Sequence, residues 1–237
     1  MVEELKLGEI SVEVVQKDIK NIHLSVYPPT GKVRISAPLR MKFDAIRMFA
    51  LSKLSWIKSK QKKLNNQKRE SQREFIDRES HYLWGRRYLL NIVESVQSPR
   101  VELKHDKIVL HVKQKSSRRT MEALVEQWYR DLIKEEAPEI IAKWEPILGV
   151  KVKRVFVQLM KTKWGSCSPK TASVRLNTEL ARKPKEFLEY IIVHEMTHLR
   201  VPTHNARFAS IMDQNMPNWR QYRDELNRLP LRDVTWS

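Results

Sequence analysis

The chain has 237 residues, of which 41% are hydrophobic, and it contains seven tryptophans. This composition excludes an intrinsically disordered chain, and the length allows one large or two small domains with a substantial core. No apolar run of about 18 residues occurs, and the acidic start at Met1–Leu5 lacks the pattern of a signal peptide. Because Cys167 is the only cysteine, an internal disulfide is excluded. We therefore expect a cytoplasmic protein without membrane contact.

The formal net charge of +17 indicates a strongly basic surface. Basic residues are densest between positions 45 and 69, where no acidic residue occurs. They are Arg47, Lys53, Lys58, Lys60, Lys62, Lys63, Lys68 and Arg69. Such a field attracts polyanions, so DNA or another polyanion is a candidate partner. A solvated basic surface without a partner is the alternative, and no nucleic-acid-binding signature decides between them.

The N-terminal half is predicted to be β-rich with one long basic helix. Apolar and polar residues alternate over residues 10–38, around a Pro- and Gly-containing interruption, which predicts a β-hairpin. Residues 43–66 follow the period of an amphipathic helix with lysines on its outer face. Residues 81–95 and 100–113 again predict strands, with Gly85 at a turn or bulge.

After a polar break at 113–119, the pattern predicts a second helix. Its expected apolar stripe consists of Met121, Leu124, Val125, Trp128 and Leu132. Pro138 is expected either to kink this helix or to begin another. Residues 151–159 predict a strand, and a loop over 164–169 leads to a short strand at 174–177.

Pro184 is expected to open a further helix, and helical stretches follow at 206–214 and 218–229. No internal repeat is evident. The predicted fold class is α+β, with a β-rich basic subdomain at 1–115 and a catalytic subdomain at 118–237. The catalytic subdomain is expected to combine a helical core with a short antiparallel sheet.

The most informative stretch is an HExxH motif, His194-Glu195-Met196-Thr197-His198, followed by His204. Imidazoles at i and i+4 lie on one helix face, so His194 and His198 can bind one metal ion. His204 completes a three-ligand set with an open fourth position, which favours zinc (Zn²⁺). Glu195 is placed to take a proton from a zinc-bound water. A solvated helix with ordinary surface histidines is the alternative, but the apolar residues before the motif argue against it.

The same spacing occurs in metzincin-type proteases, which have a glycine turn where this chain has Val201-Pro202. A closer resemblance is to the YgjP-like metallopeptidases, which are relatives of the SprT and WLM groups. It rests on segments spread over most of the chain, including Lys163–Ser168, Val174–Asn177, Pro184, Tyr190–Glu195, Leu199, His204 and Phe208. Met196 stands where that family has leucine. The resemblance implies a zincin-like catalytic core, zinc ligands His194, His198 and His204, the base Glu195, and one family domain over about residues 10–230.

By analogy with related zinc peptidases, the strand Ser173–Asn177 is expected to be an edge that pairs with an extended substrate. Trp164, Arg175 and Asn177 are therefore candidate substrate-binding residues. In the alternative interpretation Trp164 belongs to the core and Asn177 satisfies a turn. Arg175 and Tyr222 are both candidates to stabilise the oxyanion. A further hypothesis is a redox latch, in which the Cys167 thiolate reaches the zinc and silences the enzyme. The alternative is that Cys167 is a buried, inert thiol.

The predicted function is zinc-dependent hydrolysis of peptide bonds in a protein or peptide substrate, in a setting that includes nucleic acid. One alternative is a metal-dependent nucleoside-triphosphate pyrophosphatase of the UTP type. Some YgjP-like proteins are labelled with this activity. The absence of a glycine-rich phosphate loop opposes it, since the chain has five glycines. A second alternative is a nucleic-acid-binding protein with a structural zinc, which would not need Glu195.

Overall fold

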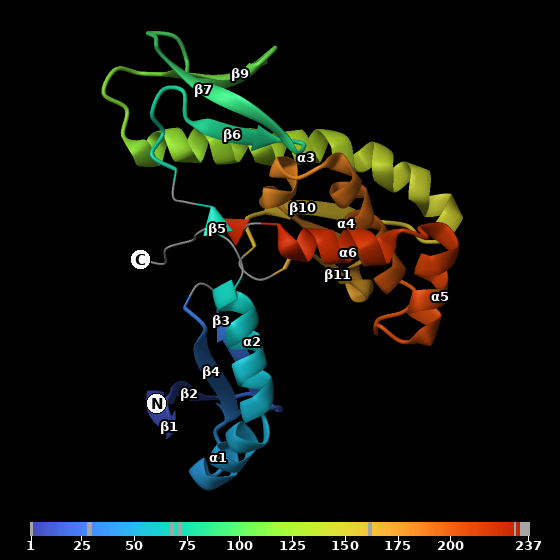
Figure 1. The fold of residues 1–237 in the computed structure, drawn as a ribbon. Helices are drawn as coiled ribbons and strands as arrows, with labels where there is room; N and C mark the ends of the chain where they lie inside the picture. The colour runs from blue at the N-terminus through green and yellow to red at the C-terminus, as the bar shows by residue number, and fades with distance from the viewer. Residues whose placement is uncertain are drawn as a thin grey trace. The chain divides into compact units, whose positions relative to one another are not determined.

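The computed structural model describes residues 2–27, 30–66, 69–70, 73–160, 163–229 and 231–232. The chain divides into two compact units, residues 1–71 with 228–237 and residues 72–227. The predicted subdomain boundary at 115–118 falls inside the second unit and stays a prediction. Both units combine strands with helices, which confirms the α+β class (Figure 1).

The first unit is built on a mixed sheet in the order β1-β2-β4-β3. Its strands are β1 (Val2–Leu7), β2 (Ile10–Lys17), β3 (His23–Tyr27) and β4 (Lys32–Pro38). β3 and β4 form the predicted hairpin, and β2 runs parallel to β4 on its other side. β1 was not predicted, although the alternation of Leu5 and Leu7 is the signal for it; it pairs antiparallel with β2.

The predicted long basic helix is two helices, α1 (Phe43–Ser52) and α2 (Leu54–Asn66), which meet at Lys53. The Ser52 hydroxyl donates to the Phe49 carbonyl at 2.8 Å, a local bond that competes with the helical ladder at the break. Both helices turn apolar residues toward the sheet. The core between them contains Val12, Val14, Val33, Ile35, Ile46, Ala50 and Ile57. The unit also holds a short parallel pairing of β5 (Arg69–Glu70) with β13 (Leu231–Arg232).

The second unit opens with another four-stranded sheet, in the order β6-β7-β9-β8. Its strands are β6 (Ser80–Leu83), β7 (Arg86–Glu94), β8 (Arg100–Lys104) and β9 (Lys107–Val112). Two antiparallel hairpins are joined by a parallel central pair, which is also the topology of the first sheet. The two sheets are therefore alike in strand order and direction, although the sequence predicts no repeat.

α3 (Arg118–Leu148) is one continuous helix that passes through Pro138. The proline is exposed, so the carbonyl that loses its partner faces solvent, and the helix curves without breaking (Figure 1). Of the predicted apolar stripe, Val125 is fully buried and the other four members are half-buried. The buried face consists of Val125, Tyr129, Ile133, Ala137, Ile141, Trp144 and Leu148.

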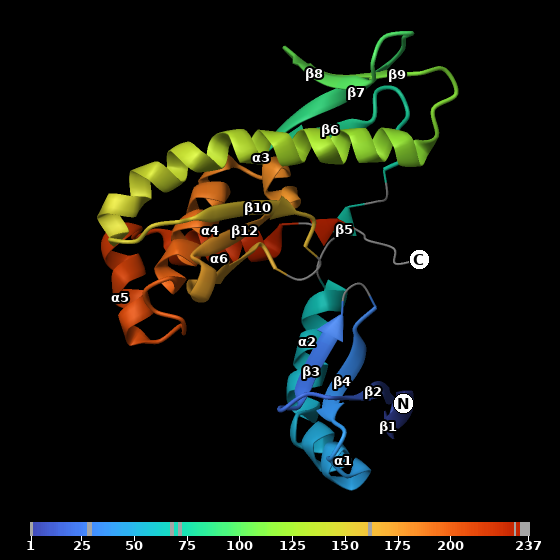
Figure 2. The same cartoon turned by 180° about the vertical axis from the view of Figure 1, so that it is seen from behind.

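The third sheet has the order β10-β12-β11 and precedes the C-terminal helices. The elements are β10 (Arg154–Gln158), β11 (Gly165–Ser168), η1 (Pro169–Thr171), β12 (Ser173–Asn177), η2 (Thr178–Arg182), α4 (Lys185–His198), α5 (Ala206–Asn215) and α6 (Trp219–Arg228). The sheet was predicted to be antiparallel but is mixed, since β10 runs parallel to β12. α3 lies between the β6–β9 sheet and the layer of β10, η2 and α4 (Figure 2). No helix in the described ranges is long and apolar enough to span a membrane.

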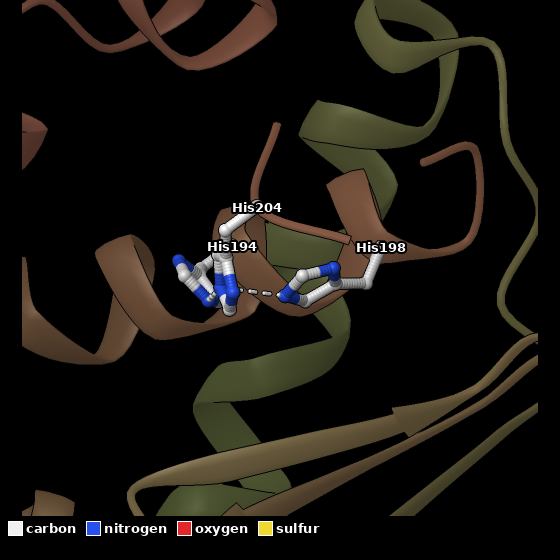
Figure 3. A group of neighbouring side chains, drawn as sticks. All are labelled: His194, His198 and His204. Atoms are coloured by element: carbon white, nitrogen blue, oxygen red, sulfur yellow. Dashed lines mark hydrogen bonds between the residues drawn. The ribbon is translucent and has the colours of Figure 1, made fainter. Parts of the chain in front are cut away.

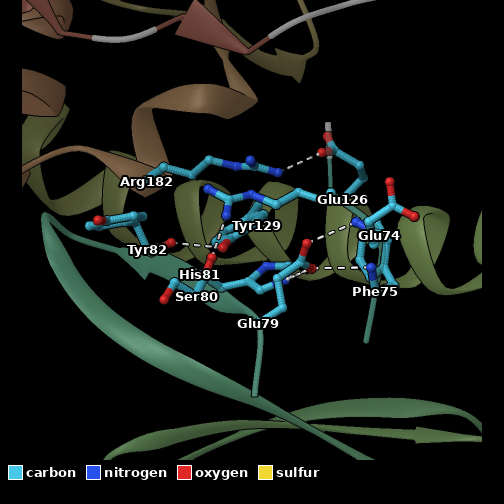
Figure 4. A network of polar contacts seen from close by, with 10 residues as sticks. Glu74, Phe75, Glu79, Ser80, His81, Tyr82, Glu126, Tyr129 and Arg182 are labelled. Atoms are coloured by element: carbon cyan, nitrogen blue, oxygen red, sulfur yellow. Dashed lines mark hydrogen bonds and ion pairs between the residues drawn. The ribbon is translucent and has the colours of Figure 1, made fainter. Parts of the chain in front are cut away.

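A buried polar network joins β6, α3 and η2 (Figure 4). The Tyr129 hydroxyl donates to the Tyr82 carbonyl at 2.7 Å. Arg182 pairs with Glu126 at 3.1 Å, and its guanidinium carbon lies 4.8 Å from the centre of the Tyr129 ring. Burial lowers the pKa of His81 to about 4, so this ring of the network is neutral near pH 7. Because η2 leads directly into α4, the network holds the start of that helix against α3.

Candidate metal centre

The predicted site is built on α4, which is buried on most sides. Ten of its fourteen residues are buried, because apolar residues occur all around its first three turns. Pro184 forms its N-cap and packs against Gly85 at the β6–β7 turn, where an added Cβ would lie 2.8 Å from the proline ring. The last turn of the helix carries His194, Glu195 and His198 into a cleft of about 570 Å³.

The chain returns to this cleft directly after α4 ends at His198. Val201 is buried, and its carbonyl oxygen accepts a hydrogen bond from His198 Nδ1 at 3.1 Å. This bond places the proton on Nδ1 and leaves the lone pair of Nε2 directed into the cleft. Pro202 follows the turn, and His204 then points back toward α4 (Figure 3).

The three histidines converge on one point. His204 Nε2 lies 3.0 Å from both His194 Nε2 and His198 Nε2, and one nitrogen from each ring falls within 4.8 Å of the others. Tetrahedral zinc with bonds of about 2.0–2.1 Å would separate its nitrogen ligands by about 3.3 Å, so His204 Nε2 would move slightly away from the other two nitrogens to admit the ion. Burial and then the two neighbouring rings lower the pKa of His194 to about 3, which keeps its donor nitrogen unprotonated. The donor set therefore fits a zinc ion.

Phe208 supports the three rings from one side. Its ring centre lies 5.0, 4.6 and 4.8 Å from those of His194, His198 and His204. Asn205 caps α5 by accepting from the Phe208 amide at 3.0 Å, so the cap that begins α5 also fixes this phenyl ring. Phe208 is one of the residues on which the family resemblance rests, but its contact with all three imidazoles was not predicted.

Glu195 lies beside the histidines and is 6% exposed. Burial raises the pKa of its carboxyl group to about 7, while the positive charge of Lys163 opposes that shift. The side chain packs directly on Gly165 of β11. An added Cβ at Gly165 would lie 2.9 Å from Glu195 Cγ and 2.8 Å from Ile191 Cγ2. Only glycine allows β11 and α4 to approach this closely.

The family model described as YgjP-like, metallopeptidase domain, matches residues 20–229. The chain belongs to this family. It is therefore a metallopeptidase, which is a hydrolase, and its family implies a protein or peptide substrate. Metallopeptidase chemistry requires a metal ion, and the three histidines are a group that could bind one.

Two solved structures are similar to part of this YgjP-like chain. The metallopeptidase zymogen of Pyrococcus abyssi abylysin is 21% identical with a TM-score of 0.35, over 38% of this chain and 90% of that one. The metallopeptidase zymogen of Methanocaldococcus jannaschii jannalysin is 23% identical with a TM-score of 0.34, over 38% of this chain and 91% of that one. No curated protein matches the chain.

The prediction that the Ser173–Asn177 strand is a substrate-binding edge is wrong. That strand, β12, lies between β10 and β11 and is paired on both sides. The loop predicted at 164–169 instead contains β11, which borders the cleft. Within the described ranges, β11 pairs on one side only, so its other edge is the free one. The small, polar residues Gly165–Ser168 carry little β-propensity, which explains why this strand was not predicted.

The three candidate substrate-binding residues have different places. Trp164 lines the cleft. Arg175 does not; its guanidinium carbon lies 5.2 Å from the centre of the Phe156 ring. Asn177 is buried, and its amide group donates to the carbonyls of Met160 and Lys163 at 2.9 and 2.8 Å. Asn177 therefore holds the main chain at Met160 and at Lys163, just before β11.

Two further residues of the cleft were not predicted, namely Tyr190 and Arg223. The Tyr190 ring lies 5.8 Å from the His194 ring, at a position one helical turn before the first ligand. Tyr222, a candidate for the oxyanion, contacts the Tyr190 ring at 6.3 Å and is not among the described lining residues. Burial, with the charge of Glu195, raises the pKa of Cys167 to about 11, which opposes the redox-latch hypothesis.

Replacement of Gly165 by alanine should disturb the base directly. The new methyl group must displace Glu195 or Ile191, so we expect a loss of about 1–3 kcal/mol in the free energy of unfolding. Because Glu195 would move, kcat/KM should fall by about 10- to 100-fold. Thermal denaturation and peptide cleavage measure the two effects. Ser168→Ala, on the same strand but not among the described residues that line the cleft, is the control; a Gly165→Ala protein with unchanged stability and turnover would contradict this contact.

Proposed function

We propose that this YgjP-like chain is a zinc-dependent metallopeptidase in which His194, His198 and His204 hold the ion and Glu195 is the general base. The proposal rests on the convergence of three imidazole nitrogens within 4.8 Å of one another, beside the buried carboxylate of Glu195 on α4. An all-nitrogen set suits zinc, whereas magnesium and calcium prefer oxygen ligands.

A bound zinc ion supplies Lewis acidity toward water and the substrate carbonyl at this site. Glu195 accepts the proton of the attacking water on its carboxylate and later delivers it to the leaving amine. Its contact with Gly165 keeps the carboxylate in one position throughout. The free edge of β11 offers main-chain groups to an extended peptide, which would lie beside Glu195.

Glu195→Gln is the direct test of this division of roles. The variant keeps the length and packing of the side chain but cannot accept the proton, so kcat should fall by about 10²- to 10⁴-fold. Zinc content and thermal stability should stay at wild-type values, since the three ligands are intact. Casein and peptide cleavage, metal analysis and a chelator-treated sample provide the measurements. Full turnover in the variant would refute the assignment of the base.

The wild-type and Glu195→Gln samples also distinguish the peptidase from the pyrophosphatase alternative. Glu195-dependent phosphate release from a nucleotide panel, without peptide cleavage, would replace the peptidase proposal. Zinc binding with neither activity would favour the structural-zinc alternative.

We also propose that single-stranded nucleic acid is a partner, through the exposed face of α1 and α2. Six exposed basic residues of the described part support this, against one acidic residue, Asp44. They are Lys42, Arg47, Lys53, Lys58, Lys60 and Lys62. Trp56 is 43% exposed, and Lys60 Nζ lies 5.6 Å from the centre of its ring. An aromatic ring among cations offers stacking to a base and contact to phosphate.

A membrane surface is the competing partner for this face. Amphipathic helices that lie on membranes present a broad apolar face. Ile46, Ala50 and Ile57 are turned into the core of the first unit, but Phe43, Met48, Leu51 and Trp56 are 36–65% exposed on the same two helices. Nucleic acid is favoured because Lys60, one helical turn after Trp56, places its cation 5.6 Å from the centre of that exposed ring.

Binding of a labelled single-stranded oligonucleotide, followed by fluorescence anisotropy, tests this partner. Trp56→Ala should weaken binding by about 5- to 150-fold through lost stacking. Lys60→Ala should reduce the salt dependence, while Lys6→Ala, an exposed lysine of β1, should do neither. If Lys6→Ala weakened oligonucleotide binding equally, the effect of the α2 variants would come from net charge and not from a specific surface. Binding to anionic vesicles and not to the oligonucleotide would replace this partner with a membrane.

A further inference from the structure

Cations outnumber carboxylates in the described lining of the cleft beside the histidines. Its described lining includes two cations, Lys163 and Arg223, and one carboxylate, that of Glu195. The two cations come from different elements, Lys163 from the segment that enters β11 and Arg223 from α6. A bound dication would add to this field. The cleft is therefore suited to a substrate that carries negative charge.

Arg223 is held in place by its neighbours on α6. Its guanidinium carbon lies 5.2 Å from the centre of the Trp219 ring, and its Nε donates to Asp224 at 2.9 Å. Trp219 is itself fixed, because it is buried and its indole N–H donates to Asp213 at 2.7 Å. The guanidinium is therefore held by one cation–π contact and by one hydrogen bond through Nε.

The terminal nitrogens of Arg223 remain available. Among the described residues neither Nη has a hydrogen-bond partner, and the side chain is 45% exposed. Burial raises the pKa of Tyr190, whose ring contacts the first metal ligand, His194; the charge of Arg223 opposes this shift, and the charges of Glu195 and Asp224 add to it. Arg223 is thus one side chain away from the metal ligands. Two parallel N–H groups on a preset guanidinium match the geometry of a carboxylate.

We propose that Arg223 is a substrate-binding residue that takes a carboxylate, so that this peptidase prefers acidic peptides. The carboxylate belongs either to an acidic side chain near the scissile bond or to the C-terminus of the peptide. Lys163 adds a second positive charge along the path into β11. This inference rests on the proposed function, because it assigns a specificity to the same cleft.

The test compares matched quenched-fluorescence peptides on the zinc-loaded full chain. The peptides carry Glu, Gln or Lys at each position around the cleavage site, with free or amidated C-termini. Wild type should cleave carboxylate-bearing peptides best. Arg223→Gln should lower kcat/KM for those peptides by about 10- to 150-fold, mainly through KM, and leave the others unchanged. Arg223→Glu should shift the preference to Lys-containing peptides.

Arg220→Gln is the matched control. Arg220 stacks on the same Trp219 ring, at 4.6 Å, and pairs with Asp213, but it does not line the cleft. This variant should keep the wild-type preference. If it lost the preference as Arg223→Gln does, the effect would belong to the packing of α6 and the inference would be overturned.

The remaining outcomes are distinct. A loss confined to free C-termini identifies the terminal carboxylate as the source, and a loss on amidated acidic peptides identifies the side chain. Equal losses on all peptides, or an unchanged preference in Arg223→Gln, overturn the inference while the Glu195-dependent peptidase stands. If wild type cleaves no peptide of any charge, the proposed function itself fails.

Discussion

The burial of α4 is the constraint on which the rest of the structure depends. α3, η2, β11, β12 and α5 all contact this helix, so its last turn is held inside the protein. The same burial limits the motion of His194 and His198, lowers the pKa of His194 and raises that of Glu195. A solvated helix with the same motif would have none of these properties. The chemistry of the site thus follows from packing around one helix.

The approach of β11 to α4 determines where a substrate could lie. Gly165 permits contact between strand and helix, and the buried Asn177 amide holds the main chain at Met160 and Lys163. On the other side, the turn at Val201 both orients His198 and returns His204. Each part of the site is held by a main-chain contact outside it.

Local periodicity explains what could be predicted from the sequence. The spacing of His194, His198 and His204 is a property of one helix and the turn after it, and these residues do converge. The order of strands is set by contacts distant in sequence, so β12 was taken for an edge although it is central. The shared topology of the two four-stranded sheets was missed for the same reason, since alternation indicates a strand but not its partner. The sequence around Arg223 contains no pattern that predicts its proposed role, because that role depends on how α6 packs beside the cleft.

We propose that three imidazoles and no thiolate hold a zinc ion at the end of α4. Zinc K-edge X-ray absorption on the zinc-loaded full chain tests this ligand set directly. We expect three histidine nitrogens at about 2.0–2.1 Å, with one fewer in His204→Ala. A sulfur ligand at about 2.3 Å would bring Cys167 into the metal's coordination and contradict this ligand set. A spectrum unchanged by His204→Ala would contradict it equally.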